Sequence, residues 1–463
     1  MKFSFLVFLL FFTAKIKATV DSCDCLSNYR YLRNFITKNY IDYNYYKEID
    51  RLGNFIDSVI GSSPQTAYSC FTNLKDYFNG FNDPHLSVRL LSNPNTFPKI
   101  QEIFSKSDSH FLVFDSTLLK NLSVSGIEGE YESIYYNMRI RLIKFRRKYY
   151  GIVVRGDNLF WYPNQVKFII PNSRKLTGEI KYFSKEHSPK AFKYSFGRNV
   201  LSIVNADEFI KDTSGSIIPY IKRVGFKNLS DSTTLLSLTD FDISCKSLID
   251  STVHASSSQI FNKPNLIIDL RGNAGGSSDS YDTLLSIILS SGNYNFPGSR
   301  MKATPDNFFN FAKGYSDFNS KYSMDSILKS LKSFKIHKDG TIKISVARSI
   351  KFTSYHIYPK HVIIITDGGV ISAAETLVDF ARQSSKVTIV GENTRGGIDN
   401  LNARSLKMPC PIFRVSYPVT QRATISRYKN GIKPDIKLLF SGYQDWVVWA
   451  KNYLEKATHE SKF

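Results

Sequence analysis

The chain has 463 residues, 42% of them hydrophobic and 22% charged, which excludes a disordered or fibrous protein and predicts two or three folded domains. Its formal net charge is +21. The basic residues are scattered along the sequence, and the basic cluster at 139–147 is not accompanied by a nucleic-acid-binding motif. We therefore expect no specific nucleic acid partner and only weak association with anionic surfaces.

The first 18 residues have the pattern of a secretory signal peptide. Lys2 precedes an apolar run from Phe5 to Phe12, and Ala18 suits cleavage by signal peptidase. No later stretch approaches the roughly 18 apolar residues that a membrane span needs. We therefore predict a secreted protein without a transmembrane segment, delivered outside the cell, to a periplasm or to an organelle lumen.

Five cysteines leave at least one thiol unpaired, and Cys70 is placed to bridge either Cys23 or Cys25. Their spacing matches no zinc pattern, and the eight histidines include no pair spaced as metal ligands on a helix. We accordingly predict neither a metal nor a cofactor.

Residues 19–95 are predicted to form an N-terminal helical cap, because apolar residues recur every three or four positions from Leu32 to Val59. The pair Asp83-Pro84 ends this pattern just before His85. Residues 96–200 then change to β-rich runs separated by Asn, Gly and Pro, which predict a small antiparallel module.

From residue 201 to residue 463 the sequence predicts an α/β core in which apolar strands alternate with helices. The strands are expected at 266–270, 362–365 and 387–390, and the helices at 281–289 and 373–383. Residues 296–345 form an insertion of undefined structure, and 445–456 predict a closing amphipathic helix.

Two glycine-rich turns, at 271–276 and 367–372, follow two of these strands, at the sheet edge where α/β proteins bind ligands. Ser372 would begin a helix, where free N–H groups stabilise a developing oxyanion. Ser372 and Glu375 also form a capping box, so the turn alone favours a helix cap. Cys410 is a weaker nucleophile candidate, since it is flanked by prolines and lacks a helix start.

The segments at 83–87, 266–276, 366–375, 390–394 and 431–436 together resemble the tail-specific (C-terminal-processing) serine peptidase family, which includes the tricorn core peptidases. The resemblance implies an α/β catalytic core with a crotonase/ClpP-like superhelix. It also implies Ser372 as nucleophile and His85 as general base. The oxyanion hole would be made by the N–H groups of Gly275 or Gly276 and of Ala373.

The chain departs from this family at two positions. The Ser-Lys branch has a lysine 25 residues after the serine, where this chain has Gly397, which argues against a Ser-Lys dyad. The histidine branch has an acid where this chain has Tyr428, so the orienting acid stays open. The candidates for that role are Glu375, Glu392 and Asp83.

The family's tail-reading PDZ module has no counterpart in the sequence, since residues 99–200 contain no glycine-rich carboxylate-binding loop. Together with the signal pattern, the resemblance implies a secreted serine peptidase that hydrolyses peptide bonds through an acyl-enzyme on Ser372. The alternative is a catalytically silent homologue that binds peptides or surfaces. Neither the substrate nor the oligomeric state follows from the sequence.

Overall fold

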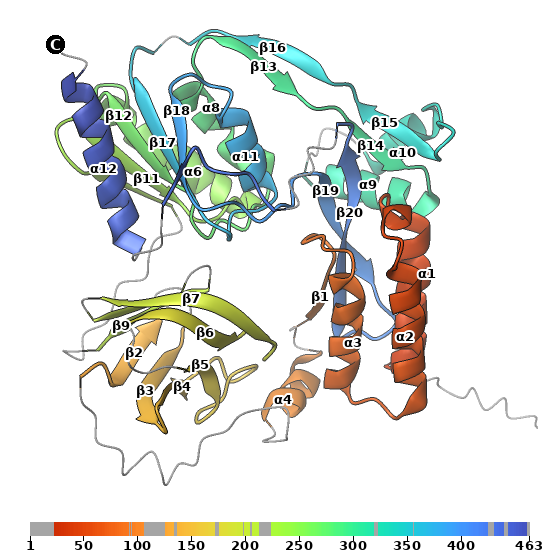
Figure 1. Ribbon diagram of the computed structural model, residues 1–463. Helices are drawn as coiled ribbons and strands as arrows, with labels where there is room; N and C mark the ends of the chain where they lie inside the picture. Colours follow the sequence, from red (N-terminus) through yellow and green to blue (C-terminus); the bar gives the residue numbers. More distant parts are fainter. Residues whose placement is uncertain are drawn as a thin grey trace, which may run out of the picture.

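The computed structural model describes residues 23–460 except 92, 94, 106–125, 134–136, 172–175, 198, 204–205, 213–223, 319–322, 355, 425–429 and 439–442. The predicted signal segment and Tyr428 lie outside the described residues. In Figure 1 the N-terminal helices, a β-barrel and an α/β unit occupy three separate regions of the molecule. No helix within the described ranges is long and apolar enough to cross a membrane.

Three helices open the described chain, and their buried residues form one continuous hydrophobic core with the barrel and the neighbouring sheet. Asp24 caps the first of them by accepting the N–H of Ser27, and Thr66 caps the third by accepting the N–H of Ser69. These elements, with a short turn and a fourth helix, are α1 Cys25–Asn39, η1 Tyr43–Tyr45, α2 Ile49–Ser62, α3 Ala67–Asn79 and α4 Phe97–Ser105.

Two disulfides tie this region together. Cys25 joins Cys70 and so links α1 to α3, which is one of the two pairings left open by the sequence. Cys23 joins Cys410 across 387 residues, a bridge that the sequence analysis did not predict. Cys245 is the free cysteine among the described residues, and it is buried.

Eight antiparallel strands between residues 129 and 211 form a closed barrel, in which the first strand pairs with the last. Alternating burial along a strand such as β2 places every second side chain in the barrel interior. The strands are β2 Gly129–Ser133, β3 Arg139–Phe145, β4 Lys148–Arg155, β5 Val166–Ile170, β6 Thr177–Phe183, β7 Pro189–Gly197, β8 Val200–Ile203 and β9 Asp207–Lys211.

A five-stranded antiparallel sheet packs beside the N-terminal helices, with β1 at one edge next to β20. The segment predicted as an insertion contributes two strands and two helices to this unit, and a two-stranded ribbon, β13 with β16, joins it to the α/β unit (Figure 1). The elements are β1 Ser87–Leu90, β13 Gly292–Phe296, β14 Ser299–Lys302, α9 Pro305–Phe318, α10 Met324–Lys332, β15 Thr341–Ser345, β16 Arg348–Phe352, β19 Asn400–Lys407 and β20 Phe413–Arg422.

The predicted α/β core is confirmed as a six-stranded mixed sheet in the order β10-β11-β12-β17-β18-β21, parallel except for β10. Every residue of β12 is buried, because helices cover both faces of the sheet. The strands are β10 Val224–Asn228, β11 Thr233–Leu238, β12 Asn265–Asp269, β17 His361–Thr366, β18 Val387–Gly391 and β21 Ile436–Lys437. The helices are η2 Ile243–Cys245, α6 Lys246–Ala255, α7 Ser257–Ile260, η3 Ser278–Tyr281, α8 Asp282–Ile288, α11 Ala373–Ala381 and α12 Tyr443–Glu460.

Helix α12 is the predicted closing helix, and it packs alone on one face of this sheet. Its Trp446 and Leu454 bury Ile267, Ile363 and Ile365, while α6, α8 and α11 cover the opposite face. Successive residues of each strand point alternately into these two cores. Both faces of the sheet are therefore buried, which is why the strand sequences are continuously apolar. The loop from β18 to β19 then leads from this sheet to the five-stranded sheet.

Candidate active site

Ser372 lies in the turn between β17 and α11, at the carboxyl end of the parallel strands. Its backbone has φ 60° and ψ −122°, a conformation that residues other than glycine rarely adopt. Such strain costs about 1–3 kcal/mol and persists only where surrounding contacts impose it. An ordinary N-cap residue lies in the β region instead, so capping alone does not account for this backbone.

The carboxylate of Glu375 is the centre of the contacts that impose this turn. It is fully buried and accepts four hydrogen bonds. Oε2 accepts the N–H of Ser372 at 3.1 Å and of Gly397 at 2.7 Å. Oε1 accepts the hydroxyl of Thr394 at 2.6 Å and the N–H of Gly396 at 2.7 Å. Glu375 therefore clamps residues 394–397 onto the serine turn, and these contacts include no histidine.

The glycine-rich turn after β12 lies directly against Ser372. A Cβ atom added to Gly275 would lie 2.9 Å from Cβ of Ser372, so the approach requires glycine. The N–H of Gly275 donates to Oδ1 of Asn273 at 2.9 Å. Within the described ranges, the N–H groups of Gly276 and Ala373 have no acceptor. Of the three predicted oxyanion donors, these two are available to a ligand.

Asp367 holds the two glycine-rich turns together. Its Oδ1 accepts the N–H of Gly272 at 3.0 Å and that of Gly369 at 2.9 Å. Burial raises the pKa of Asp367 to about 6, although the two N–H donors and the charge of Arg271 act to lower it. Arg271 itself pairs with Asp269 at 2.6 Å inside the protein, which fixes the start of the first turn.

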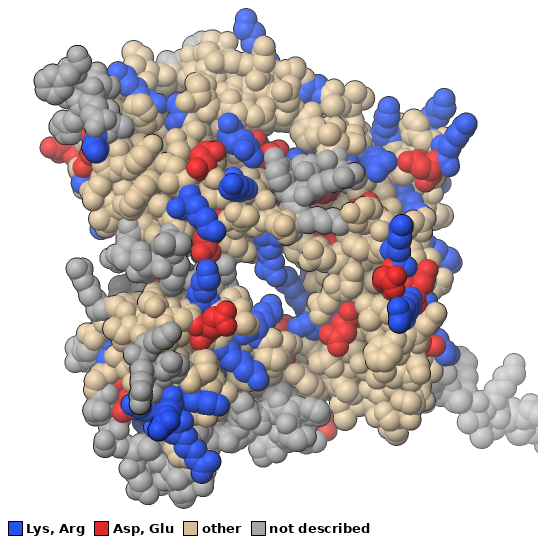
Figure 2. Space-filling model, viewed as in Figure 1, with Lys and Arg blue, Asp and Glu red and all other residues tan. Residues whose placement is uncertain are grey.

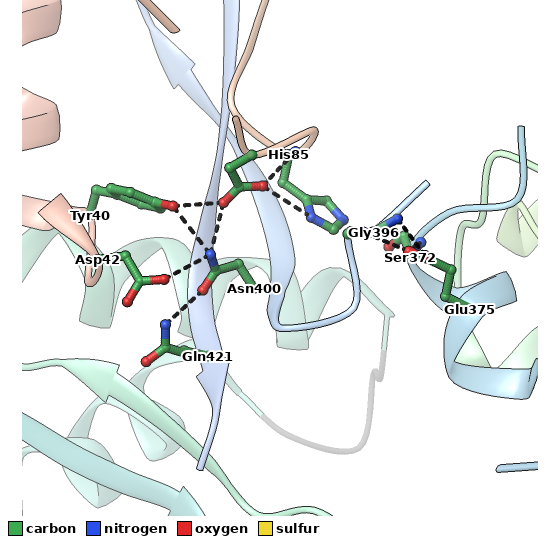
Figure 3. Close-up of polar contacts among 10 residues, drawn as sticks. Tyr40, Asp42, His85, Ser372, Glu375, Gly396, Asn400 and Gln421 are labelled. Carbon is green, nitrogen blue, oxygen red and sulfur yellow. Dashed lines mark hydrogen bonds and ion pairs between the residues drawn. The ribbon is translucent and has the colours of Figure 1, made fainter. Parts of the chain in front are cut away.

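His85 reaches the site from the turn between α3 and β1. Its Nδ1 lies 3.7 Å from Oδ1 of Asp83, and both side chains are buried. Oδ2 of Asp83 accepts the hydroxyl of Tyr40 at 2.8 Å and Nδ2 of Asn400 at 2.9 Å (Figure 3). Burial acts to raise the pKa of Asp83, but its contacts with His85 and Tyr40 hold that pKa below its usual value.

Further polar contacts extend from Asp83 into the five-stranded sheet. Asn400 donates to Asp42 at 3.1 Å and accepts from Nε2 of Gln421 at 3.0 Å (Figure 3). Gln421 in turn accepts from Arg300 at 2.7 Å. No local sequence pattern predicts this network, because tertiary packing brings its members together from distant parts of the chain.

Gly397 lies between the histidine and the serine turn. A Cβ atom there would lie 3.0 Å from Cε1 of His85 and 2.9 Å from Cγ1 of Ile371, the residue before Ser372. In Figure 3 the imidazole points toward Gly396 and Ser372. Neither ring nitrogen of His85 has a hydrogen-bond partner among the described residues. The two predicted catalytic side chains thus face each other across a single glycine without a hydrogen bond.

The remaining candidates lie elsewhere or are engaged. Among the described contacts, none joins Glu392 to His85, and the backbone of Glu392 instead bonds Thr366. Cys410 is bridged to Cys23, which leaves it no thiol for nucleophilic attack. In the described part of the chain, no group of three or more potential ligands could hold a metal ion.

Residues 232–438 match the model of peptidase family S41. No curated protein matches the chain in sequence. The match includes Ser372 and both glycine-rich turns, but it begins well after His85 in the sequence.

Several solved structures resemble the chain over most of its length. They include mature CPAF complexed with lactacystin, at 14% identity over 94% of this chain and 98% of that one, with a TM-score of 0.46. The photosystem II D1 C-terminal processing protease matches at 12% identity, over 91% of this chain and 93% of its own, with a TM-score of 0.38. The tricorn protease matches at 10% identity, over 90% of this chain and 34% of its own, also with a TM-score of 0.38. Likenesses this distant carry no assignment of their own, and the family match is to residues 232–438.

Proposed function

We propose that Ser372 is the nucleophile and His85 the general base of this protein, whose residues 232–438 match the model of peptidase family S41, a family of serine peptidases. The observation that carries the proposal is the strained backbone of Ser372 at the start of α11. That strain coincides with two unbonded N–H groups and a facing imidazole. Nucleophile, base and oxyanion donors are the parts that acyl transfer needs.

In the proposed reaction, Oγ of Ser372 attacks the carbonyl carbon of the scissile peptide bond while His85 accepts the hydroxyl proton. The N–H groups of Gly276 and Ala373 donate to the oxygen as its negative charge develops. His85 then returns the proton to the departing amine, leaving an acyl-enzyme on Ser372. A water molecule, deprotonated by the same histidine, hydrolyses that ester and regenerates the serine.

We assign Asp83 as the acid that orients His85. It is the one of the three sequence candidates whose carboxylate adjoins the imidazole. Its depressed pKa keeps it ionised at neutral pH, so it stabilises the imidazolium that forms during attack. Glu375 instead acts on the turn geometry, through the four hydrogen bonds described above.

The unbonded imidazole of His85 is compatible with this assignment. Catalytic hydrogen bonds are often long in ligand-free sites and shorten when substrate excludes water. Gly397, with no side chain, leaves the imidazole free to approach Oγ of Ser372. Proton transfer requires a separation of about 3 Å, so we propose that the turn between α3 and β1 moves toward Ser372 when substrate binds.

Secretion and the core architecture form part of the same proposal. Two disulfides among the described residues favour an oxidising compartment, which agrees with the signal pattern at residues 1–18. The parallel strands β11, β12, β17 and β18, with helices between them, support the crotonase-like arrangement that the family resemblance implies.

A fluorophosphonate probe tests the nucleophile directly, because it labels only an activated serine. We expect labelling of the wild-type protein near neutral pH, no labelling of Ser372→Ala, and labelling slowed by at least about 100-fold in His85→Ala. Ser277→Ala is a matched control on a neighbouring turn and should label normally. Wild-type protein that binds peptides but takes no label at any pH would instead indicate the silent homologue.

A further inference from the structure

Three cationic side chains from three different parts of the fold lie around the candidate active site. Arg395 is in the loop from β18 to β19, next to the glycines that separate Ser372 from His85, and its N–H donates to the carbonyl oxygen of Val370 at 2.9 Å. Arg89 is on β1, four residues after His85. Lys190 is on β7 of the barrel. All three side chains are exposed.

Local contacts bring these elements together. Val88 and Leu90 point into the core, so Arg89 between them projects from the opposite face of β1. Lys75 of α3 donates from Nζ to the hydroxyl of Ser188 at 2.9 Å, which places the start of β7 beside the helix that leads to His85. The barrel thereby contributes Lys190 to the same region as the loop and β1.

The electrostatics agree with this proximity. Although Lys190 and Arg395 reach solvent, the surrounding protein partly desolvates both side chains. This desolvation, and then the positive charges of Arg395, Lys75 and Arg89, lower the pKa of Lys190. Desolvation and the charge of Arg89 likewise lower the pKa of Arg395. Like charges held together in this way destabilise one another unless an anion joins them.

The acidic groups nearby do not neutralise this cluster. Glu186 acts electrostatically on Lys75 and Lys190, but no ion pair joins it to either residue within the described ranges. Glu375, which faces Arg395, already accepts four hydrogen bonds. Among the described residues, Arg89, Lys190 and Arg395 form no salt bridge. Figure 2 shows Lys and Arg side chains around the opening between the barrel and the rest of the molecule.

The barrel also limits how a substrate can be held. Because β2 pairs with β9, its strands present no unpaired edge to which a peptide could add as a further strand. The barrel strands can therefore contribute side chains but no strand pairing, and Lys190 is a barrel side chain on which the charges of Arg395 and Arg89 act.

We propose that Arg395, Arg89 and Lys190 form a subsite that binds a substrate carboxylate close to the scissile bond, so that the enzyme favours peptides with Asp or Glu there. Guanidinium groups suit this role because they donate two parallel hydrogen bonds to a carboxylate. The subsite rests on the proposed function, since it is defined by its position beside Ser372 and His85. An acidic side chain and a free C-terminus both carry a carboxylate, so the experiment must distinguish these two sources.

To test this proposal, a complex mixture of cellular peptides is digested with full-length wild-type protein and, in parallel, with Ser372→Ala. The new peptide termini in each digest are identified by mass spectrometry. One sample keeps free carboxyl termini, and a second has them amidated. We expect Asp and Glu to be enriched within about four residues of the cleaved bonds in both samples. Cleavage without this enrichment overturns the subsite and leaves the peptidase assignment intact. Enrichment lost on amidation overturns the side-chain proposal in favour of terminus binding, and no wild-type cleavage contradicts the proposed function itself.

Variants then assign the preference to the three residues. A matched pair of peptides, differing only by Glu or Gln at the enriched position, gives a ratio of kcat/KM values. We expect Arg395→Gln to reduce this ratio by roughly tenfold, the worth of one charge-assisted hydrogen bond. Arg89→Gln and Lys190→Gln should each reduce it less, and 0.5 M salt should weaken it. Lys332→Gln, an exposed cation on α10, is the control, and an equal effect there would contradict the assignment.

Discussion

Oδ1 of Asp83 lies 3.7 Å from Nδ1 of His85, while the other carboxylate oxygen is held by Tyr40 and Asn400. The acid beside the proposed base is therefore itself positioned by two neutral donors. One donor comes from the N-terminal helical region and the other from the start of β19. This arrangement fixes where the imidazole can lie and makes the role of each member separable by substitution.

Asp83→Asn should reduce kcat by about 100- to 10,000-fold, because an amide cannot stabilise the imidazolium as the carboxylate does. KM should change little, since Asp83 is buried and so is not expected to contact substrate. Steady-state kinetics on a mapped peptide would measure both values. Asn400→Asp is informative beside it, because it exchanges a donor for a second charge against Asp83. An unchanged kcat in Asp83→Asn would contradict the assignment of Asp83 as the orienting acid.

The lowered pKa of Asp83 predicts that the free energy of unfolding falls in acid. Its pKa is lowered in the folded protein, so the ionised form stabilises folding above its unfolded-state pKa. That contribution should be lost as pH falls from about 4 through the lower, folded-state value. Urea unfolding at a series of pH values would measure it as the difference between wild type and Asp83→Asn. A difference that does not change between pH 6 and pH 3 would contradict this linkage.

Gly397→Ala should impair catalysis without unfolding the protein. Its Cβ would lie 3.0 Å from Cε1 of His85, so the imidazole must move away from its position facing Ser372. We expect fluorophosphonate labelling to slow by about tenfold or more, with a melting temperature close to wild type. Gly61→Ala on α2 meets no atom within 4 Å and serves as the control, in which labelling should stay normal. Normal labelling in both variants would show that Gly397 does not limit the approach.

Glu375→Gln keeps the shape of the side chain but replaces one acceptor oxygen with an NH₂ group that faces N–H donors. Leaving such buried donors unsatisfied costs about 1–3 kcal/mol each, so the variant should unfold at lower denaturant. The serine turn should loosen with it, which reduces labelling of Ser372. Glu392→Gln, which carries the same change on the neighbouring loop, should affect neither measurement. Wild-type stability in Glu375→Gln would mean that its hydrogen bonds do not hold the turn.

The two disulfides can be tested by peptide mapping. Digestion without reduction should yield two cross-linked peptide pairs, Cys23 with Cys410 and Cys25 with Cys70, while Cys245 alone alkylates after denaturation. Replacing both Cys23 and Cys410 with serine should lower the free energy of unfolding by about 2–4 kcal/mol. Recovery of a Cys23–Cys70 pair from native protein would contradict this connectivity.

The sequence predicted the α/β core well because its strands are buried on both faces. Runs such as 266–270 and 362–365 coincide with β12 and β17 almost to the residue. The closure of the barrel could not be predicted, since it depends on β2 pairing with β9 about 80 residues later, and alternating burial is the same in open and closed sheets.

The candidate site was predictable in its parts but not in its assembly. Glycine turns and Ser372 carry local patterns, whereas the contacts of Asp83 with Tyr40 and Asn400 depend on tertiary packing. The conformation of Ser372 was equally hidden, because a capping box predicts ordinary N-cap geometry. In the folded chain the strained φ of Ser372 shows that the same four residues do more than begin a helix.

The order of the site along the chain has a consequence for biosynthesis. His85 is made nearly 300 residues before Ser372, and the Cys23–Cys410 bridge can form only after residue 410 has been made. A growing chain that has not reached Ser372 therefore carries the proposed base without the proposed nucleophile. If the two residues act as proposed, proteolytic capacity would arise only after β20 docks against the first helices, so the growing chain is protected from its own cleavage.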